Sequence, residues 1–153
     1  IINCAGVLNS SAEENPDQAI LINSYLPHFL EKATSKSTTK VIHISTDCVF
    51  SGKSGGYIES DLKDGIGFYA QSKALGEIIN NKDLTIRTSI IGPDVNVNGI
   101  GLFKWVLNQS GTINGYTRAF WSGVTTIQLS KIIIEFINRS SIPTGLIHLT
   151  NNW

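Results

Sequence analysis

The segment Lys40-Val41-Ile42-His43-Ile44-Ser45 sets the architecture of this chain. Its apolar character is nearly continuous, which is typical of a central strand covered on both faces of a sheet. Strands of this kind occur in parallel sheets, where a crossover helix joins one strand to the next. The segment therefore predicts an α/β fold.

The residues before this segment supply the partners that such a strand needs. Ile1 to Cys4 reads as a buried strand that ends at the small-residue turn Ala5-Gly6. Asn15-Pro16 then marks a helix start, with Asn as N-cap and Pro at the first helical position. The helix has one apolar stripe and should be kinked at Pro27. The stripe consists of Ala19, Ile22, Leu26, Phe29, Leu30 and Ala33. Strand, helix and strand of these lengths form a right-handed parallel unit.

The residues that follow repeat the unit once. A glycine-rich and acidic loop over residues 51–64 leads to a helix that begins near Tyr69, and residues 84–91 are predicted as a third parallel strand. This is half of a Rossmann-like, doubly wound parallel sheet. Residues 93–153 change in composition, and we assign them to a small second region. In that region we expect helices over 102–107 and 127–137, an extended piece over 112–116 and a last strand over 145–150.

Length and composition exclude several classes of protein. The 153 residues fit one domain, and 12 basic residues balance 12 acidic ones. We therefore expect no nucleic-acid or membrane surface, since both need a concentrated positive field. Two cysteines make no disulfide framework, and no cluster has metal-ligand spacing. The chain opens without Met inside a strand, so we expect an excerpt of a longer cytoplasmic polypeptide.

Tyr69 and Lys73 form the most informative pair for chemistry. They are four residues apart on a predicted helix, so both side chains lie on one face. A fixed positive charge favours a phenolate, so Lys73 could lower the pKa of Tyr69 and make it an acid catalyst. Taken alone, the pair is equally a half-buried aromatic residue followed by a surface lysine.

Thr46 gives a second indication of a site. It follows the central strand at its carboxyl end, where ligands bind in open parallel sheets. Its hydroxyl could share a hydrogen bond with a substrate oxygen and with Tyr69. The alternative is that Ser45-Thr46 serves only as turn chemistry.

In combination these features resemble the extended short-chain dehydrogenase/reductase superfamily. The chain is most similar there to the reductases that make dTDP-rhamnose from dTDP-4-dehydrorhamnose. The resemblance covers most of residues 1–92, and four ordered motifs are more specific than any single one. The motifs are Asn3-Cys4-Ala5-Gly6, Ser45-Thr46-Asp47 with Val49-Phe50, Tyr69 to Lys73 with Gly76-Glu77, and Ile86-Arg87-Thr88-Ser89.

The resemblance implies roles for the residues of the first part. Tyr69 would protonate the sugar C4 oxygen, Thr46 would orient the carbonyl, and Lys73 would hold the nicotinamide ribose. Ala5 and Gly6 would let an NADPH or NADH cofactor approach the backbone closely. Residues 1–92 would then be the second half of an NAD(P)-binding Rossmann domain.

The resemblance also assigns substrate contacts. Residues 93–153 would belong to the sugar-nucleotide-binding region, with Arg118 on a phosphate and Trp121 against a ring. Asp47 would contact the substrate at the strand end. The alternative for Arg118 and Trp121 is a packed aromatic turn with a solvated arginine.

Two features depart from the family pattern. The family's glycine-rich phosphate turn would lie upstream of Ile1, so this fragment alone should bind dinucleotide weakly and be inactive. Cys48 stands where the rhamnose-forming reductases usually have Tyr. Scattered carboxylates at Glu59, Asp61 and Asp64 are expected to be a solvated rim rather than a metal cage.

The expected function is NAD(P)H-dependent reduction of a nucleotide-linked 4-keto-6-deoxy sugar for bacterial surface polysaccharide. An epimerase or dehydratase of the same superfamily is a second interpretation, and a non-catalytic regulatory subunit is a third. The expected partner is the nucleotide sugar. Whether the protein assembles as a homodimer is left open by the sequence. Arg87 is expected to pair with a carboxylate such as Glu77 across the helix-to-strand layer.

Overall fold

The central element is a parallel sheet of four strands, three of which the sequence placed in such a sheet, while the fourth was expected in the second region. The computed structural model describes residues 1–94, 99, 101–139 and 141–151. The strand order is β1 (Ile2–Asn3), β2 (Ile42–Thr46), β3 (Leu84–Thr88) and β6 (Gly145–His148). Each neighbouring pair is parallel. The crossover connections therefore bring the carboxyl ends of these strands to one edge.

The core lies around β2 and β3. All five residues of β3 are buried, and Ile42 of β2 pairs in register with Leu84 of β3. Val41 and Ile86 have no exposed surface. Because β3 is covered on both faces, it has no polar solvent face, and its polar side chains must find partners inside the protein.

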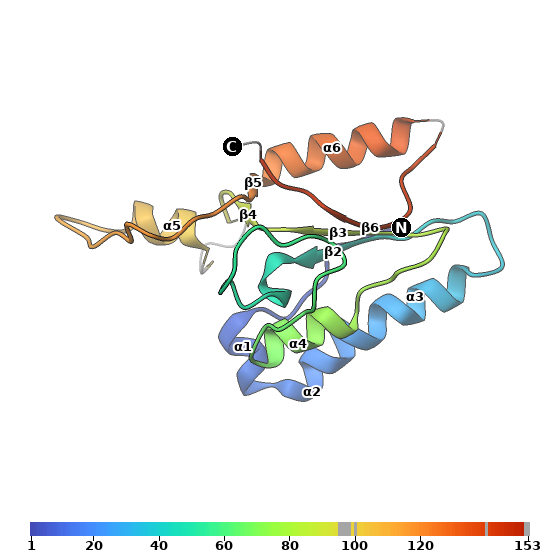
Figure 1. Cartoon of the computed structure of the whole chain (residues 1–153), viewed down its shortest axis with the longest axis horizontal. Helices are drawn as coiled ribbons and strands as arrows, with labels where there is room; N and C mark the ends of the chain where they lie inside the picture. The colour runs from blue at the N-terminus through green and yellow to red at the C-terminus, as the bar shows by residue number, and fades with distance from the viewer. Residues whose placement is uncertain (95–98, 100, 140, 152–153) are drawn as a thin grey trace. The chain divides into compact units, whose positions relative to one another are not determined.

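A layer of helices covers one face of this sheet (Figure 1). It contains α1 (Asn9–Glu14), α2 (Pro16–Ala19), α3 (Leu26–Thr34) and α4 (Phe68–Leu75). Residues Ile20–Tyr25, the segment η1, form a π-helix between α2 and α3. The predicted kink is therefore a change of helix type before Pro27. Pro27 has no N–H to donate to the carbonyl of Asn23, so the α-helical bond between these two residues is absent.

The predicted third strand over 84–91 is wrong in its second half. It ends as β3 at Thr88, and a separate strand β4 (Ile90–Ile91) pairs in parallel with β5 (Val124–Thr125). Two further helices are α5 (Leu102–Leu107) and α6 (Thr126–Asn138). Residues 112–116 have no regular secondary structure, so the expected extended piece is not a strand.

The chain divides into two compact units, each with its own contacts. The first contains Ile1–Thr88 and Ile142–Leu149, and the second contains Ser89–Ser141 and Thr150–Trp153. The last strand, β6, thus belongs to the first unit through its pairing with β3. Composition suggested a boundary after residue 92, between a cofactor-binding part and a substrate-binding part. That functional division stays a prediction.

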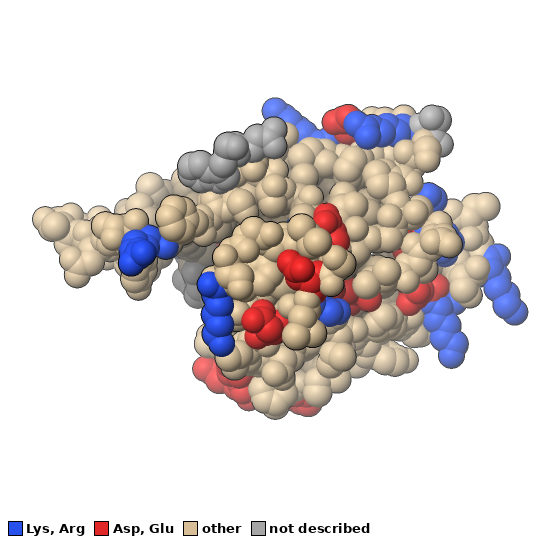
Figure 2. All heavy atoms as spheres, viewed as in Figure 1, with Lys and Arg blue, Asp and Glu red and all other residues tan. Residues whose placement is uncertain are grey.

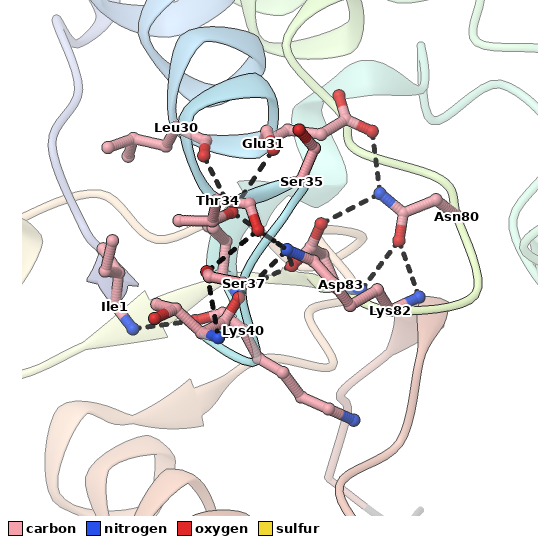
Figure 3. A network of polar contacts seen from close by, with 12 residues as sticks. Ile1, Leu30, Glu31, Thr34, Ser35, Ser37, Lys40, Asn80, Lys82 and Asp83 are labelled. Atoms are coloured by element: carbon pink, nitrogen blue, oxygen red, sulfur yellow. Dashed lines mark hydrogen bonds and ion pairs between the residues drawn. The ribbon is translucent and has the colours of Figure 1, made fainter.

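A polar network closes the end of the first unit where β2 and β3 begin (Figure 3). The Lys82 ammonium donates to the Thr34 carbonyl at 2.7 Å, the Thr34 hydroxyl at 3.0 Å and the Thr39 carbonyl at 3.0 Å. Asp83 accepts from the Val41 amide at 2.8 Å and from Asn80 at 2.9 Å. Lys82 therefore joins the last residue of α3, Thr34, to Thr39 in the loop that leads to β2.

Acidic and basic side chains are interspersed over the face shown in Figure 2. Among the helices of the described residues, none is both long enough and apolar enough to cross a lipid bilayer.

Candidate active site

Thr46 occupies the carboxyl end of β2 and shapes the turn after it. Its hydroxyl accepts a hydrogen bond from the Cys48 amide at 3.1 Å and lies 3.3 Å from a carboxylate oxygen of Asp47, to which it donates. Thr46 is buried, whereas Asp47 and Cys48 are exposed. The 3₁₀ turn η2 (Asp47–Val49) therefore presents two polar side chains to solvent beside a fixed hydroxyl.

Tyr69 stands in the first turn of α4 and meets Thr46. Tyr69 is half-buried, and its phenol lies close enough to the Thr46 side chain to interact with it. Burial raises the pKa of Tyr69, and the interaction with Thr46 lowers it by less. The two hydroxyls that the sequence placed at one strand end thus lie together, and the phenol is protonated at neutral pH.

Lys73 lies one turn further along α4, with its side chain buried. Its ammonium donates a 2.7 Å hydrogen bond to the carbonyl of Ile44 in β2. Burial lowers the pKa of Lys73 from its usual 10.5 to about 8, while the negative charge of Glu77 acts in the opposite direction. At neutral pH the group is mostly protonated and attached to the central strand.

One expectation for this pair needs correction. The sequence suggested that Lys73 would lower the pKa of Tyr69, but burial dominates and raises it. The Lys73 ammonium is directed to the backbone of β2. The phenol is therefore poised to give a proton rather than to stay ionised.

Ala5 and Gly6 form an exposed backbone turn directly after β1. The Asn3 side chain shapes this turn by accepting from the Ala5 amide at 3.2 Å. A Cβ at Gly6 would meet only the Asn23 side-chain oxygen, at 3.5 Å. The turn is thus open to a ligand.

Asn23 is a residue of this region that sequence reasoning missed. It has no exposed surface and lies in the π-helix η1. Its side chain accepts from the Val7 amide at 2.8 Å and donates to the Val7 carbonyl at 2.9 Å and the Ser72 hydroxyl at 3.0 Å. Asn23 therefore joins the turn after β1 to the helix of Tyr69. The one available signal was an asparagine four residues before a proline inside an apolar stripe.

Both ends of α4 are held by side chains from other segments. At the N-terminus, Glu13 accepts from the Tyr69 amide at 3.4 Å, close to Gly67, whose φ is +94°. At the C-terminus, Ser24, Lys63 and His28 hydrogen-bond three carbonyl groups. These carbonyls belong to Ser72, Ala74 and Leu75, at 2.7, 2.8 and 2.8 Å. An eight-residue helix is marginal alone, so these contacts fix its position.

The predicted pairing of Arg87 with Glu77 is confirmed. The Arg87 guanidinium binds the Glu77 carboxylate through two bonds of 2.7 and 2.8 Å. Both residues are buried.

Arg118 and Trp121 belong to the second unit. Arg118 is exposed, and the Trp121 indole N–H donates to the Ser89 hydroxyl at 2.8 Å with 39% of the residue exposed. Their role with a substrate stays a prediction. Within the described residues, no group of three or more His, Cys, Asp or Glu residues is arranged to hold a metal ion.

Comparison with known proteins identifies the family of the chain. The family profile described as RmlD substrate binding domain matches residues 1–152. The spore coat polysaccharide biosynthesis protein SpsK of Bacillus subtilis is 28% identical over 95% of this chain and 55% of its own length. A dTDP-4-dehydrorhamnose reductase of Mycobacterium tuberculosis is 37% identical over 50% of this chain and 27% of its own length.

Solved structures show the same fold. A hypothetical dTDP-4-dehydrorhamnose reductase from Sulfolobus tokodaii has a TM-score of 0.85 and 28% identity, covering 99% of this chain and 55% of that one. A dTDP-4-dehydrorhamnose reductase from Bacillus anthracis, in complex with NADP, has a TM-score of 0.84 and 28% identity, covering 100% and 56%. The chain thus spans about half the length of these structures.

A parallel sheet with a tyrosine and a lysine of one helix beside the strand ends defines the class: this is a Rossmann-like α/β protein. Within that class, the chain belongs to the RmlD substrate binding domain family.

Proposed function

We propose that this chain is part of an NAD(P)H-dependent oxidoreductase of the short-chain dehydrogenase/reductase type. Its substrate would be a nucleotide-linked 4-keto-6-deoxy sugar, used in deoxysugar and surface polysaccharide synthesis. The observation that carries the proposal is that Tyr69 meets the Thr46 side chain at the carboxyl end of β2, while the buried Lys73 of the same helix binds the Ile44 carbonyl of that strand. The names of the relatives support the substrate class.

The residues present fit the nicotinamide end of such a cofactor, either NADPH or NADH. The open backbone at Ala5 and Gly6 admits a flat ring, and the Lys73 ammonium suits ribose hydroxyls as a donor. The structure of the Bacillus anthracis relative in complex with NADP supports this assignment. When bound, the dinucleotide supplies the hydride.

The side chains would then handle the proton. As the sugar carbonyl carbon gains a C–H bond, its π electrons move to the oxygen, and Tyr69 gives that oxygen a proton. A raised pKa keeps the phenol protonated until this step. Thr46 would donate to the same oxygen.

The substrate contacts belong to the same proposal. Asp47 is exposed next to Thr46 and suits sugar hydroxyls, while Arg118 suits a diphosphate and Trp121 a ring. Replacing Arg118 by Gln should raise KM for the nucleotide sugar and leave kcat unchanged. A lowered kcat with an unchanged KM would exclude this role.

The test follows absorbance of the reduced dinucleotide while a dTDP-4-keto-6-deoxy sugar is supplied. We infer that the chain alone binds dinucleotide weakly, so a second sample fuses the N-terminal part of the Bacillus anthracis relative to Ile1. Tyr69→Phe in the fusion should lower the rate by about 10² to 10⁴. Tyr25→Phe, at an exposed tyrosine, is the matched control and should leave the rate unchanged.

Three outcomes distinguish the alternatives. An unchanged rate in Tyr69→Phe excludes the catalytic role. Conversion of the sugar without net loss of reduced dinucleotide indicates an epimerase or dehydratase. Full folding with no turnover in the fusion indicates a non-catalytic subunit. The proposal includes a cytoplasmic location, because reduced dinucleotides are the reagents of that compartment.

We also propose a homodimer, formed by the outer side of η1 and α3. Leu21, Tyr25 and Phe29 are spaced four residues apart, each is at least half exposed, and the last two rings stack at 6.0 Å. A hollow of about 450 Å³ lies beside them, lined by Tyr25, His28, Phe29, Lys32 and Ala33. Tyr25→Glu should convert a dimer into a monomer in sedimentation experiments, and a wild-type monomer would refute the assembly.

A further inference from the structure

A single carboxylate connects the segments that build the site. Glu77 follows the end of α4, and its side chain has no exposed surface. It accepts hydrogen bonds from Ser45 of β2, Arg87 of β3 and Lys63 of the loop before α4. The distances are 2.9 Å to the Ser45 hydroxyl, 2.7 and 2.8 Å to the guanidinium and 3.2 Å to the Lys63 ammonium.

The connected segments carry the reacting groups. Ser45 directly precedes Thr46, and Glu77 stands four residues after Lys73. The Glu77 carboxylate therefore joins the strand end that holds Thr46 to the helix that holds Tyr69 and Lys73. Lys63 adds a second link, because its ammonium also donates to the Ala74 carbonyl at the end of α4.

The arginine partner is itself held in one orientation. Arg87 donates to the Glu59 carbonyl and lies within hydrogen-bond distance of His148, both at 3.1 Å. Its guanidinium also lies 5.0 Å from the ring centre of Phe50. Because the guanidinium is held by these contacts, it fixes the position of the Glu77 carboxylate relative to the strand β3.

Stability gives a poor explanation for this arrangement. Removing two charges from water is costly, and apolar residues of similar volume often replace a buried ion pair without loss of stability. A buried ion pair with this many directional contacts fixes geometry instead.

We propose that Glu77 is a positioning residue, which sets the alignment of Tyr69 and Lys73 on α4 with Thr46 on β2. This inference rests on the proposed function, because it concerns the same site. Glu77 acts through its contacts to Ser45, Arg87 and Lys63 and not through contact with a substrate.

The test separates position from stability with the double variant Glu77→Met/Arg87→Met. The matched control is Glu135→Met/Arg139→Met, which removes an exposed ion pair of α6. Urea unfolding gives the stability of each protein. NMR titrations of labelled tyrosine and lysine carbons, assigned with Tyr69→Phe and Lys73→Arg, report the environment of the two groups.

We expect the double variant to unfold at a urea concentration no lower than that of the wild type. The Lys73 titration should move down by about one pH unit, because the nearby negative charge is gone. The Tyr69 titration should move up, because the interaction of its phenol with Thr46 is weakened. The control should leave both titrations in place. A folded double variant with wild-type titrations would overturn the proposal.

Two single variants cover a failure of the double variant to fold. Glu77→Asp keeps the charge but shortens the reach, so the Tyr69 titration should move while that of Lys73 moves little. Glu77→Gln keeps the reach and removes the charge, so the Lys73 titration should move more. Loss of the fold in all three would identify Glu77 as a residue of the fold alone and overturn the positioning role.

The titrations need neither cofactor nor substrate, so the two proposals fail separately. Shifted titrations in a protein whose fusion consumes no dinucleotide would refute the proposed function and retain the positioning. A working reductase with unshifted titrations would retain the proposed function and refute the positioning role of Glu77.

Discussion

Replacing Asn23 by Ala should be among the most destabilising polar substitutions in this chain. The side chain makes three hydrogen bonds, two with the Val7 backbone and one with the Ser72 hydroxyl. Ser72 in turn donates to the Tyr69 carbonyl at 3.1 Å. Truncation would leave these groups without their partner and open a cavity between η1 and α4.

The magnitude follows from burial. Each lost bond costs about 1 kcal/mol, and a group left buried and unpaired costs about 1–3 kcal/mol. Val7 is only half-buried, so water can replace part of what its amide and carbonyl lose. We therefore expect the free energy of unfolding to fall by about 3 kcal/mol, the sum of three bonds at the lower value.

Urea unfolding followed by circular dichroism measures this change. Gln18→Ala, at an exposed position of α2, is the matched control and should change the unfolding free energy by less than about 0.5 kcal/mol. Asn23→Asp keeps the acceptor for the Val7 amide but places a carboxylate oxygen next to the Val7 carbonyl oxygen, which repels it. This variant should therefore recover little of the lost unfolding free energy. If Asn23→Ala lowered the free energy of unfolding no more than the control does, the hydrogen bonds of Asn23 to Val7 and Ser72 would not stabilise the fold as expected.

Three further predictions concern the surroundings of α4 and the opposite end of the sheet. The bond to Glu31 raises the pKa of His28, so its protonated form stabilises the fold at pH values below the unfolded pKa. Unfolding free energy should therefore fall by up to about 1 kcal/mol as pH rises through the folded pKa, and Glu31→Gln should flatten that profile in urea titrations at pH 5 to 8. Gly76→Ala should destabilise by about 3 kcal/mol in thermal or urea unfolding, because the new Cβ would overlap the Asn23 carbonyl; an unchanged midpoint would contradict the close approach. Lys82→Met should lower the free energy of unfolding by about 1–2 kcal/mol in urea unfolding, because three hydrogen bonds of the ammonium are lost. The same change at exposed Lys36 should leave the unfolding free energy unchanged.

The sequence was a good guide to elements whose residues follow one dominant period. The continuous apolar run at residues 41–44 predicted β2, and the stripe of residues 127–137 predicted α6. The pairing of Arg87 with Glu77 was also predictable, because a charge inside a buried strand requires an opposite charge nearby. In each case a local pattern leaves few structural solutions.

Contacts between distant segments were beyond sequence reasoning. The 3.6-residue pattern does not reveal the extra residue that makes a π-helix, so the turn at Ile20–Tyr25 was predicted as a kink at Pro27. The Lys73 ammonium binds a backbone carbonyl 29 residues away, and carbonyl positions have no residue-type signature. The expected effect of Lys73 on the Tyr69 pKa failed for that reason.

The short length of α4 explains why so many of these distant contacts converge on it. Eight residues with only three buried side chains cannot hold a fixed position by helix propensity and apolar packing alone. Two of the candidate catalytic groups nevertheless stand on this helix, while the third stands on β2. The alignment between them must therefore come from polar contacts: Asn23 and Ser24 at Ser72 in the second half of the helix, Glu13 at its start, and Glu77 beyond its end. It follows that variants at these four positions should disturb the Tyr69 and Thr46 geometry more than equally destabilising changes in the apolar core.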